Sequence, residues 1–364
     1  MPAELGFATE SMAMVLFSGF AHSLKWEYMM VCKVLVTGGT GFVGGAVLRS
    51  LIRQEGYSAV AAVHSPGSLL PEEVSVVPVG DLSSSTDWGV ALDGVDVVVH
   101  CAARAHVMKE TAADPLALYR EVNVKGSVAL AHQAAAAGVR RFVFLSSIAA
   151  EVQHAALLSL IKDKEKVTQS DYPFVLDEKL WLKDPYGASK YDAEQELNQI
   201  STQTGMELVI IRPPLVYGPE AKGNFLSMLR WLDKGVPLPL GSVHNRRSLV
   251  GIDNLISLIL TCITHPAAPY QTFSVSDGED LSTTELLHRM GLFLGKPARL
   301  IPIPESLLQL VAGAIGKKKL ARKLLGSLQV DVSKTREQLN WNPPLSVNDG
   351  LRKTAEWYLQ SRNR

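Results

Sequence analysis

From Val31 onward, short apolar runs alternate with longer segments in which apolar residues recur every three or four positions. Short runs rich in valine and isoleucine are typical of buried parallel strands, whereas the longer period is typical of amphipathic helices. Strands are therefore expected within residues 31–39, 57–65, 74–82, 94–103, 139–148 and 206–218, and helices over 42–56, 84–92, 114–137 and 186–205. This alternation predicts an α/β fold with a doubly wound parallel sheet of the Rossmann type.

The pattern changes after Gly218, where prolines become frequent, helical segments become shorter and strand-like runs are sparse. We therefore expect a Rossmann domain over residues 31–218 and a smaller C-terminal α/β domain over residues 219–364, partly interleaved with it. The second domain is expected to cover the carboxyl edge of the sheet. Ligands of doubly wound folds bind in the crevice at that edge, so the second domain is expected to bind substrate.

Two segments could be mistaken for membrane elements. Residues Met12–Phe20 are apolar, but they are too few to span a bilayer, and no positive charge precedes them. Because a pair of methionines stands directly before the first strand, residues 1–30 are expected to be a dispensable leader. Residues Ser306–Gly326 join an apolar stretch to a basic one. They are expected to form a helix packed on the second domain rather than a membrane contact.

Composition narrows the classes of partner. The 364 residues include 36 basic and 36 acidic side chains, so the net charge recruits neither nucleic acid nor an anionic membrane surface. The three cysteines, Cys32, Cys101 and Cys262, are far apart and show no metal-ligand spacing. Reduced thiols in apolar runs fit a cytoplasmic protein, and we expect no metal, no nucleic acid and no stable membrane insertion.

A glycine-rich segment, Thr37–Gly44 (TGGTGFVG), follows the first predicted strand and opens a helix. Such glycines allow a tight turn and a close approach of the backbone to a pyrophosphate, which N–H groups of the next helix can bind. A plain strand-to-helix turn is the alternative, but the βαβ context favours a dinucleotide site. The expected contacts are Gly38, Gly41, Phe42, Val43 and Gly44.

The end of the second strand bears on which dinucleotide binds. A carboxylate there would hydrogen-bond the ribose 2′-hydroxyl of NAD, but this chain has Val63-His64-Ser65. Because no carboxylate would repel a 2′-phosphate, NADP is permitted as well as NAD. His64 is either a cofactor contact or an ordinary surface histidine.

A YxxxK motif, Tyr186 to Lys190, supplies candidate acid–base chemistry. Residues four apart share a helix face, so Lys190 lies beside Tyr186. An ammonium at roughly 5 Å, in an effective dielectric of about 20, favours the phenolate by about 3 kcal/mol, or about two pK units. We therefore expect Lys190 to lower the pKa of Tyr186. Ser147, at the end of a predicted strand, can hold a substrate oxygen.

The chain resembles the extended short-chain dehydrogenases/reductases of the nucleotide-sugar epimerase/dehydratase family over residues 31–358. The resemblance rests on the glycine-rich turn, GDL at 80–82, HCAA at 100–103, Asn123, Ser146-Ser147 and YxxxK, in that order. It implies Ser147, Tyr186 and Lys190 as catalytic residues, with Asn123 in support. The cofactor contacts that it implies are Asp81, Leu82, Ala102, Ala103, Lys190 and Pro213, and the contacts to the substrate are Ser147, Asn224 and Arg247, the last two at the diphosphate of a sugar nucleotide.

The resemblance extends to bacterial enzymes of surface-polysaccharide (lipopolysaccharide) synthesis and leaves two activities open. In the first, NAD(P)H reduces a UDP-4-keto-6-deoxy-N-acetylhexosamine at C4 while Tyr186 donates the proton. In the second, a UDP-sugar 4-epimerase of the UDP-glucose or UDP-N-acetylglucosamine type retains NAD. We expect the reductase, because the missing carboxylate at His64 suits an enzyme that exchanges its cofactor.

Two further readings are less favoured. A 4,6-dehydratase needs a carboxylate pair after the active-site hydroxyl, and Ile148-Ala149 stands there. A non-enzymatic NAD(P)-binding protein would not need both Tyr186 and Lys190.

Two departures from the family pattern fall beside the expected sugar pocket. An insert at about 151–183, expected to be partly helical, lengthens the stretch between Ser147 and Tyr186, and the glycine-containing turn that usually follows the serine is missing. Both departures bear on which sugar is bound. The helices over 114–137 and 186–205 form the subunit interface in such relatives, so a homodimer is expected.

Overall fold

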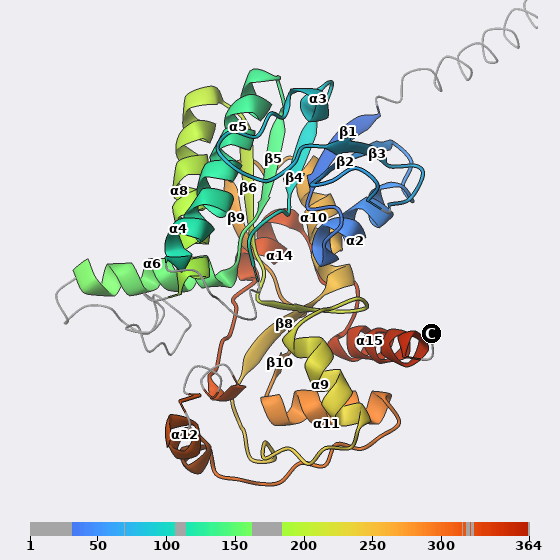
Figure 1. Cartoon of the computed structure of the whole chain (residues 1–364), viewed down its shortest axis with the longest axis vertical. Helices are drawn as coiled ribbons and strands as arrows, with labels where there is room; N and C mark the ends of the chain where they lie inside the picture. Colours follow the sequence, from blue (N-terminus) through green and yellow to red (C-terminus); the bar gives the residue numbers. More distant parts are fainter. Residues whose placement is uncertain are drawn as a thin grey trace, which may run out of the picture.

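In the computed structural model, residues 31–68, 70–105, 114–161, 184–314, 316–317, 321 and 324–362 are described, apart from the side chains of residues 155–161 and Asn224. The largest element is a seven-stranded sheet in the order β3-β2-β1-β4-β5-β6-β9, in which all neighbouring strands are parallel (Figure 1). Its strands are β1 (Cys32–Thr37), β2 (Tyr57–Val63), β3 (Ser75–Pro78), β4 (Val97–His100), β5 (Arg141–Leu145), β6 (Glu207–Arg212) and β9 (Gln271–Ser274). The predicted doubly wound Rossmann sheet is confirmed.

Helices cover both faces of this sheet because each strand alternates its side chains between them. In β1, Val34 and Val36 belong to the core on one face and Leu35 to the core on the other. The first face carries α2 (Phe42–Leu51), α10 (Ile252–Thr264) and α14 (Ser333–Leu339); the second carries α3 (Gly89–Leu92), α5 (Gly126–Ala136) and α8 (Pro185–Thr204).

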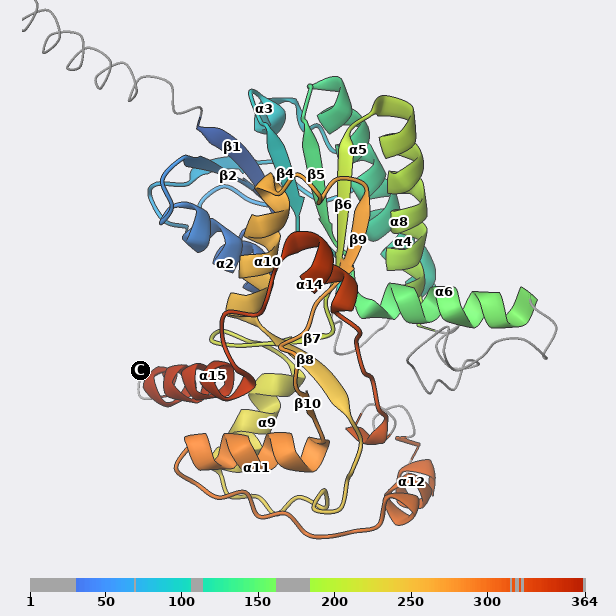
Figure 2. The same cartoon turned by 180° about the vertical axis from the view of Figure 1, so that it is seen from behind.

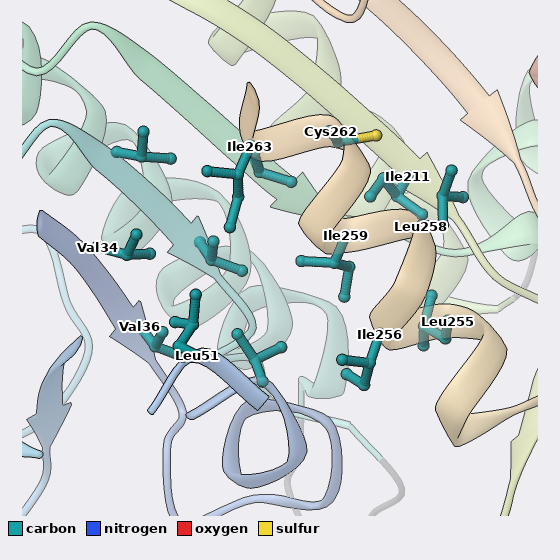
Figure 3. Packing of buried hydrophobic residues seen from close by; sticks show 14 of the residues in the cluster. Val34, Val36, Leu51, Ile211, Leu255, Ile256, Leu258, Ile259, Cys262 and Ile263 are labelled. Carbon is teal, nitrogen blue, oxygen red and sulfur yellow. The ribbon is translucent and has the colours of Figure 1, made fainter. Parts of the chain in front are cut away.

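Three elements of the large sheet domain come from beyond Gly218, namely α10, β9 and α14. Strand β9 pairs with β6, and α10 packs against the face that holds Val34, Val36 and Ile211 (Figure 3). Figure 2 shows α10 lying across the back of the sheet. Strand β9 was not predicted from the sequence, because a strand of four residues with one buried side chain, Phe273, leaves little hydrophobic pattern.

The single strand region predicted over 206–218 is wrong, because it divides between two sheets. Strand β6 ends at Arg212, and β7 (Leu215–Tyr217) pairs instead with β8 (Arg247–Gly251). Pro213 and Pro214 lie between them. Proline has no N–H to donate to a ladder, so the pair ends β6 and lets the chain leave for the second domain.

The second domain lies at the carboxyl ends of the large sheet's strands (Figures 1 and 2). It contains a three-stranded sheet in the order β10-β8-β7. The Tyr217 hydroxyl, buried in its core, donates a hydrogen bond of 2.7 Å to Asp277. The remaining elements of this domain are β10 (Asp280–Leu281), α9 (Asn224–Asp233), α11 (Thr283–Phe293), α12 (Glu305–Ala314) and α15 (Val347–Ser361).

Several helices differ from their predicted form. The helix expected over 114–137 is α4 (Pro115–Arg120), a π-helical turn η1 (Glu121–Lys125) and α5, and the helix expected over 84–92 is reduced to α3. Helix α6 (Ile148–Ile161) begins directly after Ser147 and contains the first part of the expected insert. Residues 162–183 of the insert and the leader 1–30 lie outside the described residues.

Helix α12 does not pack as expected. None of its residues is buried, and Leu307, Leu310 and Val311 are exposed, so the predicted packing of this segment on the second domain is wrong for α12. No helix in the described part of the chain is long and apolar enough to cross a membrane.

Candidate active site

At two glycines of the turn between β1 and α2, the surrounding backbone leaves no room for a Cβ atom. Gly38 has a φ of +70°, and a Cβ there would lie 2.9 Å from the Ala102 nitrogen. A Cβ on Gly44 would lie 2.3 Å from the Gly38 oxygen. The Gly41 N–H donates to that same oxygen at 2.8 Å, and α2 begins at the next residue, Phe42, with Val43 in its first turn. The backbone and the N-terminus of α2 therefore form a surface that fits a pyrophosphate.

A carboxylate reaches the end of β2 from the neighbouring chain segment. Asp81, which follows β3, has its Oδ1 atom 3.0 Å from Nε2 of His64, and Nδ1 of His64 lies 2.6 Å from the Ser65 hydroxyl. Both members of the His64–Asp81 pair are largely exposed. The end of β2 itself carries no carboxylate, as expected, but parallel pairing of β2 with β3 brings Asp81 alongside it. Leu82, the next residue, packs against Gly126.

Ala102 and Ala103 follow β4 beside the turn. The Ala102 N–H donates to the Thr37 hydroxyl at 3.1 Å, so the segment after β4 is held against the segment after β1. These two segments belong to adjacent strands of the sheet. The glycine-rich turn thus lies at the carboxyl end of β1, the two alanines at that of β4, and the His64–Asp81 pair at that of β2. A dinucleotide fits at this edge of the sheet.

Helix α8 carries the acid–base motif. Asp184 caps its N-terminus by accepting a hydrogen bond from the Gly187 N–H, and Tyr186 follows in the first turn. The Tyr186 and Ser147 side chains are hydrogen-bonded to each other. The Ser147 hydroxyl also accepts from the Ala149 N–H at 3.2 Å, because α6 starts immediately after the serine. The structure thus brings together the predicted serine and tyrosine.

Lys190 lies one turn after Tyr186 and is buried. Its Nζ donates to the Leu145 carbonyl at 2.8 Å and lies 4.4 Å from the centre of the Phe144 ring. Burial lowers the pKa of Lys190 to about 8, while Cys101 and Glu194 act in the opposite direction. An ammonium with this pKa remains mostly protonated at neutral pH.

The pKa of Tyr186 moves in the direction opposite to the expected one. Burial raises it to about 12; the hydrogen bond from Ser147 lowers it, and Asp184 and Tyr119 raise it. The Lys190 ammonium donates a hydrogen bond to the Leu145 carbonyl and does not reverse the increase in the pKa of Tyr186. Tyr186 is therefore a phenol at neutral pH in this structure.

Asn123 lies in the π-helical turn η1 and is buried. Its Oδ1 accepts from the Arg104 N–H at 2.7 Å, and its Nδ2 donates to the Arg104 carbonyl and to the Ser189 hydroxyl, at 3.1 and 2.9 Å. Ser189 stands between Tyr186 and Lys190 on α8. The contacts of Asn123 therefore reach α8, the helix that carries Tyr186 and Lys190.

A buried ion pair next to the site, between Glu194 and Arg212, was not predicted from the sequence. Glu194, four residues after Lys190, accepts hydrogen bonds from the Ser146 hydroxyl at 2.5 Å and from Arg212 Nε and Nη2, at 3.0 and 2.5 Å. Arg212 also pairs with Glu151 of α6 at 3.5 Å. The signal available in the sequence was the i, i+4 spacing of Glu194 from Lys190 on a helix facing the core.

Pro213, a predicted cofactor contact, lies at the entry to the second domain, and two of the predicted substrate contacts, Arg247 and Asn224, lie within that domain. The Pro213 carbonyl accepts from the Ile148 N–H at 3.0 Å, which fixes this residue beside Ser147. The parallel register pairs Leu215 with Leu249, so Arg247, at the start of β8, lies toward the same end as Pro213. Burial lowers the pKa of Arg247, whose Nη1 donates to the Gly326 carbonyl at 3.3 Å. Asn224 opens α9, and its side chain lies outside the described atoms.

The chain matches the NAD dependent epimerase/dehydratase family over residues 34–276, from β1 past the end of β9. It belongs to this family. It is therefore an enzyme of the NAD-dependent epimerase/dehydratase type, as the resemblance in its sequence predicts. NAD agrees with the fit of the turn between β1 and α2.

This family member has relatives along almost its whole length. It is 43% identical to the UDP-glucose 4-epimerase of Vibrio cholerae over 333 residues, which are 91% of this chain and 97% of that protein. It is 25% identical to the N-acetyl-alpha-D-glucosaminyl-diphospho-ditrans,octacis-undecaprenol 4-epimerase of Escherichia coli O157:H7 over 339 residues, 89% of this chain and 95% of that one.

Solved structures share the family fold at lower identity. The Thermotoga maritima UDP-glucose 4-epimerase with UDP-glucose gives a TM-score of 0.67 at 20% identity, covering 91% of this chain and 99% of that chain. The Bacillus cereus UDP-glucuronic acid 4-epimerase in complex with NAD gives 0.67 at 20% identity, covering 90% and 99%. These similarities support the fold.

Proposed function

We propose that this enzyme is a UDP-sugar 4-epimerase that retains NAD and acts on a UDP-hexose of the glucose or N-acetylglucosamine type. The observation that carries the proposal is 43% identity along 97% of a UDP-glucose 4-epimerase. This relationship favours the epimerase over the UDP-4-keto-6-deoxy-N-acetylhexosamine reductase that we expected from the sequence. The His64–Asp81 pair adds support, because it places a carboxylate where the reductase hypothesis assumed none.

Tyr186 is the acid–base group in this proposal. Its hydroxyl group, hydrogen-bonded to Ser147, accepts the proton of the C4 hydroxyl as phenolate when the sugar is oxidised and returns that proton to the C4 oxygen when the ketone is reduced. When bound, NAD supplies hydride acceptance and a positive charge that favours the phenolate. Ser147 orients the C4 oxygen, and the Lys190 ammonium offsets negative charge at the same end of α8. Asn123 positions that helix.

The second domain holds the remainder of the substrate. Arg247 and Asn224 bind the diphosphate, and a guanidinium suits this task because its planar donors match phosphate oxygens. Helix α6, which starts directly after Ser147, forms part of the wall around the sugar in place of the usual glycine-containing turn. The sugar preference is therefore set beside α6.

We also propose a cytoplasmic homodimer in surface-polysaccharide synthesis, with α4, α5 and α8 at the subunit interface. Leu118 of α4 is exposed, which gives this surface an apolar contact. The outward residues of α8, by contrast, include Gln195, Asn198 and Gln199. The interface would therefore rely on amide hydrogen bonds as well as apolar contacts, and light scattering that shows a monomer at micromolar concentration would contradict it.

The decisive experiment uses purified protein without added nucleotide. We expect interconversion of UDP-glucose and UDP-galactose, or of their N-acetylated counterparts, with dinucleotide released only on denaturation. Protein that is empty of dinucleotide, shows no epimerisation and consumes added NADPH or NADH stoichiometrically with a UDP-4-keto-6-deoxy sugar would instead identify the reductase.

A further inference from the structure

His100 is a buried histidine that the proposed mechanism does not use. It ends β4, two residues before Ala102, and its side chain has no exposed surface. Its ring stacks on Phe144, with centroids 5.7 Å apart, and is tilted against Phe142. Phe144 also lies under the Lys190 ammonium. His100 therefore sits between the sheet and the catalytic helix.

Both ring nitrogens of His100 have a hydroxyl partner. Nδ1 lies 2.6 Å from the Thr37 hydroxyl, and Nε2 lies 2.8 Å from the Ser127 hydroxyl. Thr37 immediately precedes Gly38 of the dinucleotide turn. Ser127 lies in the first turn of α5, directly after the π-helical turn. The imidazole thus bridges the cofactor turn and the segment that holds Asn123.

The positions of the protons follow from counting donors. The Ser127 hydroxyl donates its one proton to the Asn123 carbonyl at 2.7 Å, since a carbonyl can only accept. The Ser127 oxygen must then accept from His100, so Nε2 carries the proton. Burial, with the charge of Lys190, lowers the pKa of His100 to about 3, so the ring is neutral. Nδ1 is therefore bare and accepts from the Thr37 hydroxyl, whose oxygen accepts from the Ala102 N–H.

These hydrogen bonds continue to the catalytic tyrosine. The Asn123 side chain donates to the Ser189 hydroxyl, and Ser189 donates to the Tyr186 carbonyl at 2.8 Å. Each side chain in this series is buried and each proton has a defined place. π-Helical turns are retained mostly at functional sites, and the turn that contains Asn123 lies in the middle of the series.

We propose that His100, fixed as the neutral Nε2–H tautomer, is a positioning residue that sets the dinucleotide turn in register with the π-helical turn and, through Asn123 and Ser189, with Tyr186. It accepts no proton during the reaction. The catalytic part of this inference rests on the proposed role of Tyr186, whereas the tautomer and the coupling to dinucleotide binding do not.

The tautomer is tested directly by nuclear magnetic resonance on protein with 15N-labelled histidines. We expect one imidazole to keep the Nε2–H correlation pattern through the pH range in which exposed histidines titrate, and this signal to be missing from His100→Gln. An Nδ1–H pattern, or titration together with the exposed histidines, would overturn the proposal whatever reaction the enzyme catalyses.

The positioning role is tested with two substitutions. His100→Phe keeps the ring volume but removes both hydrogen bonds, whereas His100→Gln offers one donor and one acceptor. We expect His100→Phe to lose retained dinucleotide and to lower kcat by about tenfold to a hundredfold with little change in KM for the UDP-sugar, and His100→Gln to recover part of both. Equal losses in the two variants, or lower thermal stability with unchanged kcat and dinucleotide content, would show a merely structural role.

Ser127→Ala provides a second variant if His100→Phe does not fold. It deletes the acceptor of the Nε2 proton and leaves the imidazole in place. We expect the Nε2–H signal to shift and kcat to fall in the same direction. An unchanged signal and unchanged kcat would contradict the donor assignment. The affinity for added NAD, measured by fluorescence titration, gives a readout that requires neither epimerase turnover nor retained dinucleotide, so a different reaction would not hide the result.

Discussion

The Nε2 atom of His64 lies 3.0 Å from the Oδ1 atom of Asp81, although the two residues follow different strands, β2 and β3. A carboxylate at this edge of a Rossmann sheet hydrogen-bonds the ribose of NAD and repels the 2′-phosphate of NADP. The pair therefore brings a carboxylate from the β3 side to the end of β2, which has none of its own.

This relationship predicts the effect of Asp81→Asn. The substitution should weaken NAD binding by about tenfold, the equivalent of one charge-assisted hydrogen bond of about 1.5 kcal/mol, and should raise the relative affinity for NADP. Fluorescence titration with both dinucleotides measures the ratio. Asp87→Asn, at an exposed carboxylate nearby, is the matched control and should leave it unchanged. If Asp81→Asn leaves the ratio of the NAD and NADP affinities unaltered, Asp81 does not determine the selectivity between the two dinucleotides.

Tyr186→Phe should retain dinucleotide while losing at least about a hundredfold in kcat, because the ring stays and the transferable proton is lost. Tyr191→Phe is a matched control on the same helix; its ring stacks on His154, away from Ser147. We expect that control to keep wild-type turnover. Steady-state assays with UDP-glucose and absorbance of the bound dinucleotide measure the two effects. Substantial turnover in Tyr186→Phe would require another acid.

The lowered pKa of Lys190 predicts a pH-dependent difference in stability. Between about pH 8 and the ordinary value of 10.5, the unfolded chain holds a proton on this lysine that the folded protein has lost. Folding stability from this group therefore rises with pH across that window, by about 3 kcal/mol at most. We expect the Tm of the wild type minus that of Lys190→Met to increase from pH 8 to pH 10. A flat difference would show that the buried lysine titrates normally.

The buried pair of Glu194 and Arg212 predicts a large effect on the free energy of unfolding. Glu194→Gln leaves the guanidinium without its bidentate partner and should cost about 3–5 kcal/mol, whereas the double variant with Arg212→Met should recover part of this. Urea unfolding measures both. Lys353→Ala, which breaks an exposed pair with Asp253, serves as the control and should cost less than about 1 kcal/mol. Similar losses of unfolding free energy in Glu194→Gln and Lys353→Ala would show that the buried pair contributes no more to stability than the exposed pair.

Much of the large sheet domain could be predicted because its signals are local. The apolar runs of β1 and β4 and the turn from Gly38 to Gly44 are each contained in a few consecutive residues. That Ser147 and Tyr186 belong to one site was expected from the family resemblance, which rests on the order of the motifs along the chain. The helix spacing of Tyr186 and Lys190 was likewise sufficient to place them one turn apart.

The features that escaped prediction depend on pairing between distant segments. Asp81 meets His64 only through the register of β3 on β2, and β9 reaches the sheet from the C-terminal third of the chain. The π-helical turn around Asn123 is an extra residue in an otherwise regular helix, which apolar spacing does not reveal. The pKa of Tyr186 was misjudged because burial outweighed the neighbouring charge, and burial is a property of the whole fold.

Because α10 and β9 complete the large sheet domain, their late position in the chain affects how this domain folds during synthesis on the ribosome. Until about residue 274 has left the exit tunnel, β6 remains an open edge and the face bearing Val34 and Val36 lacks its isoleucine-rich cover. A nascent chain that stops near Gly218 would therefore expose both an unpaired strand and an apolar surface. The large sheet domain is therefore incomplete until much of the chain beyond Gly218 has been synthesised.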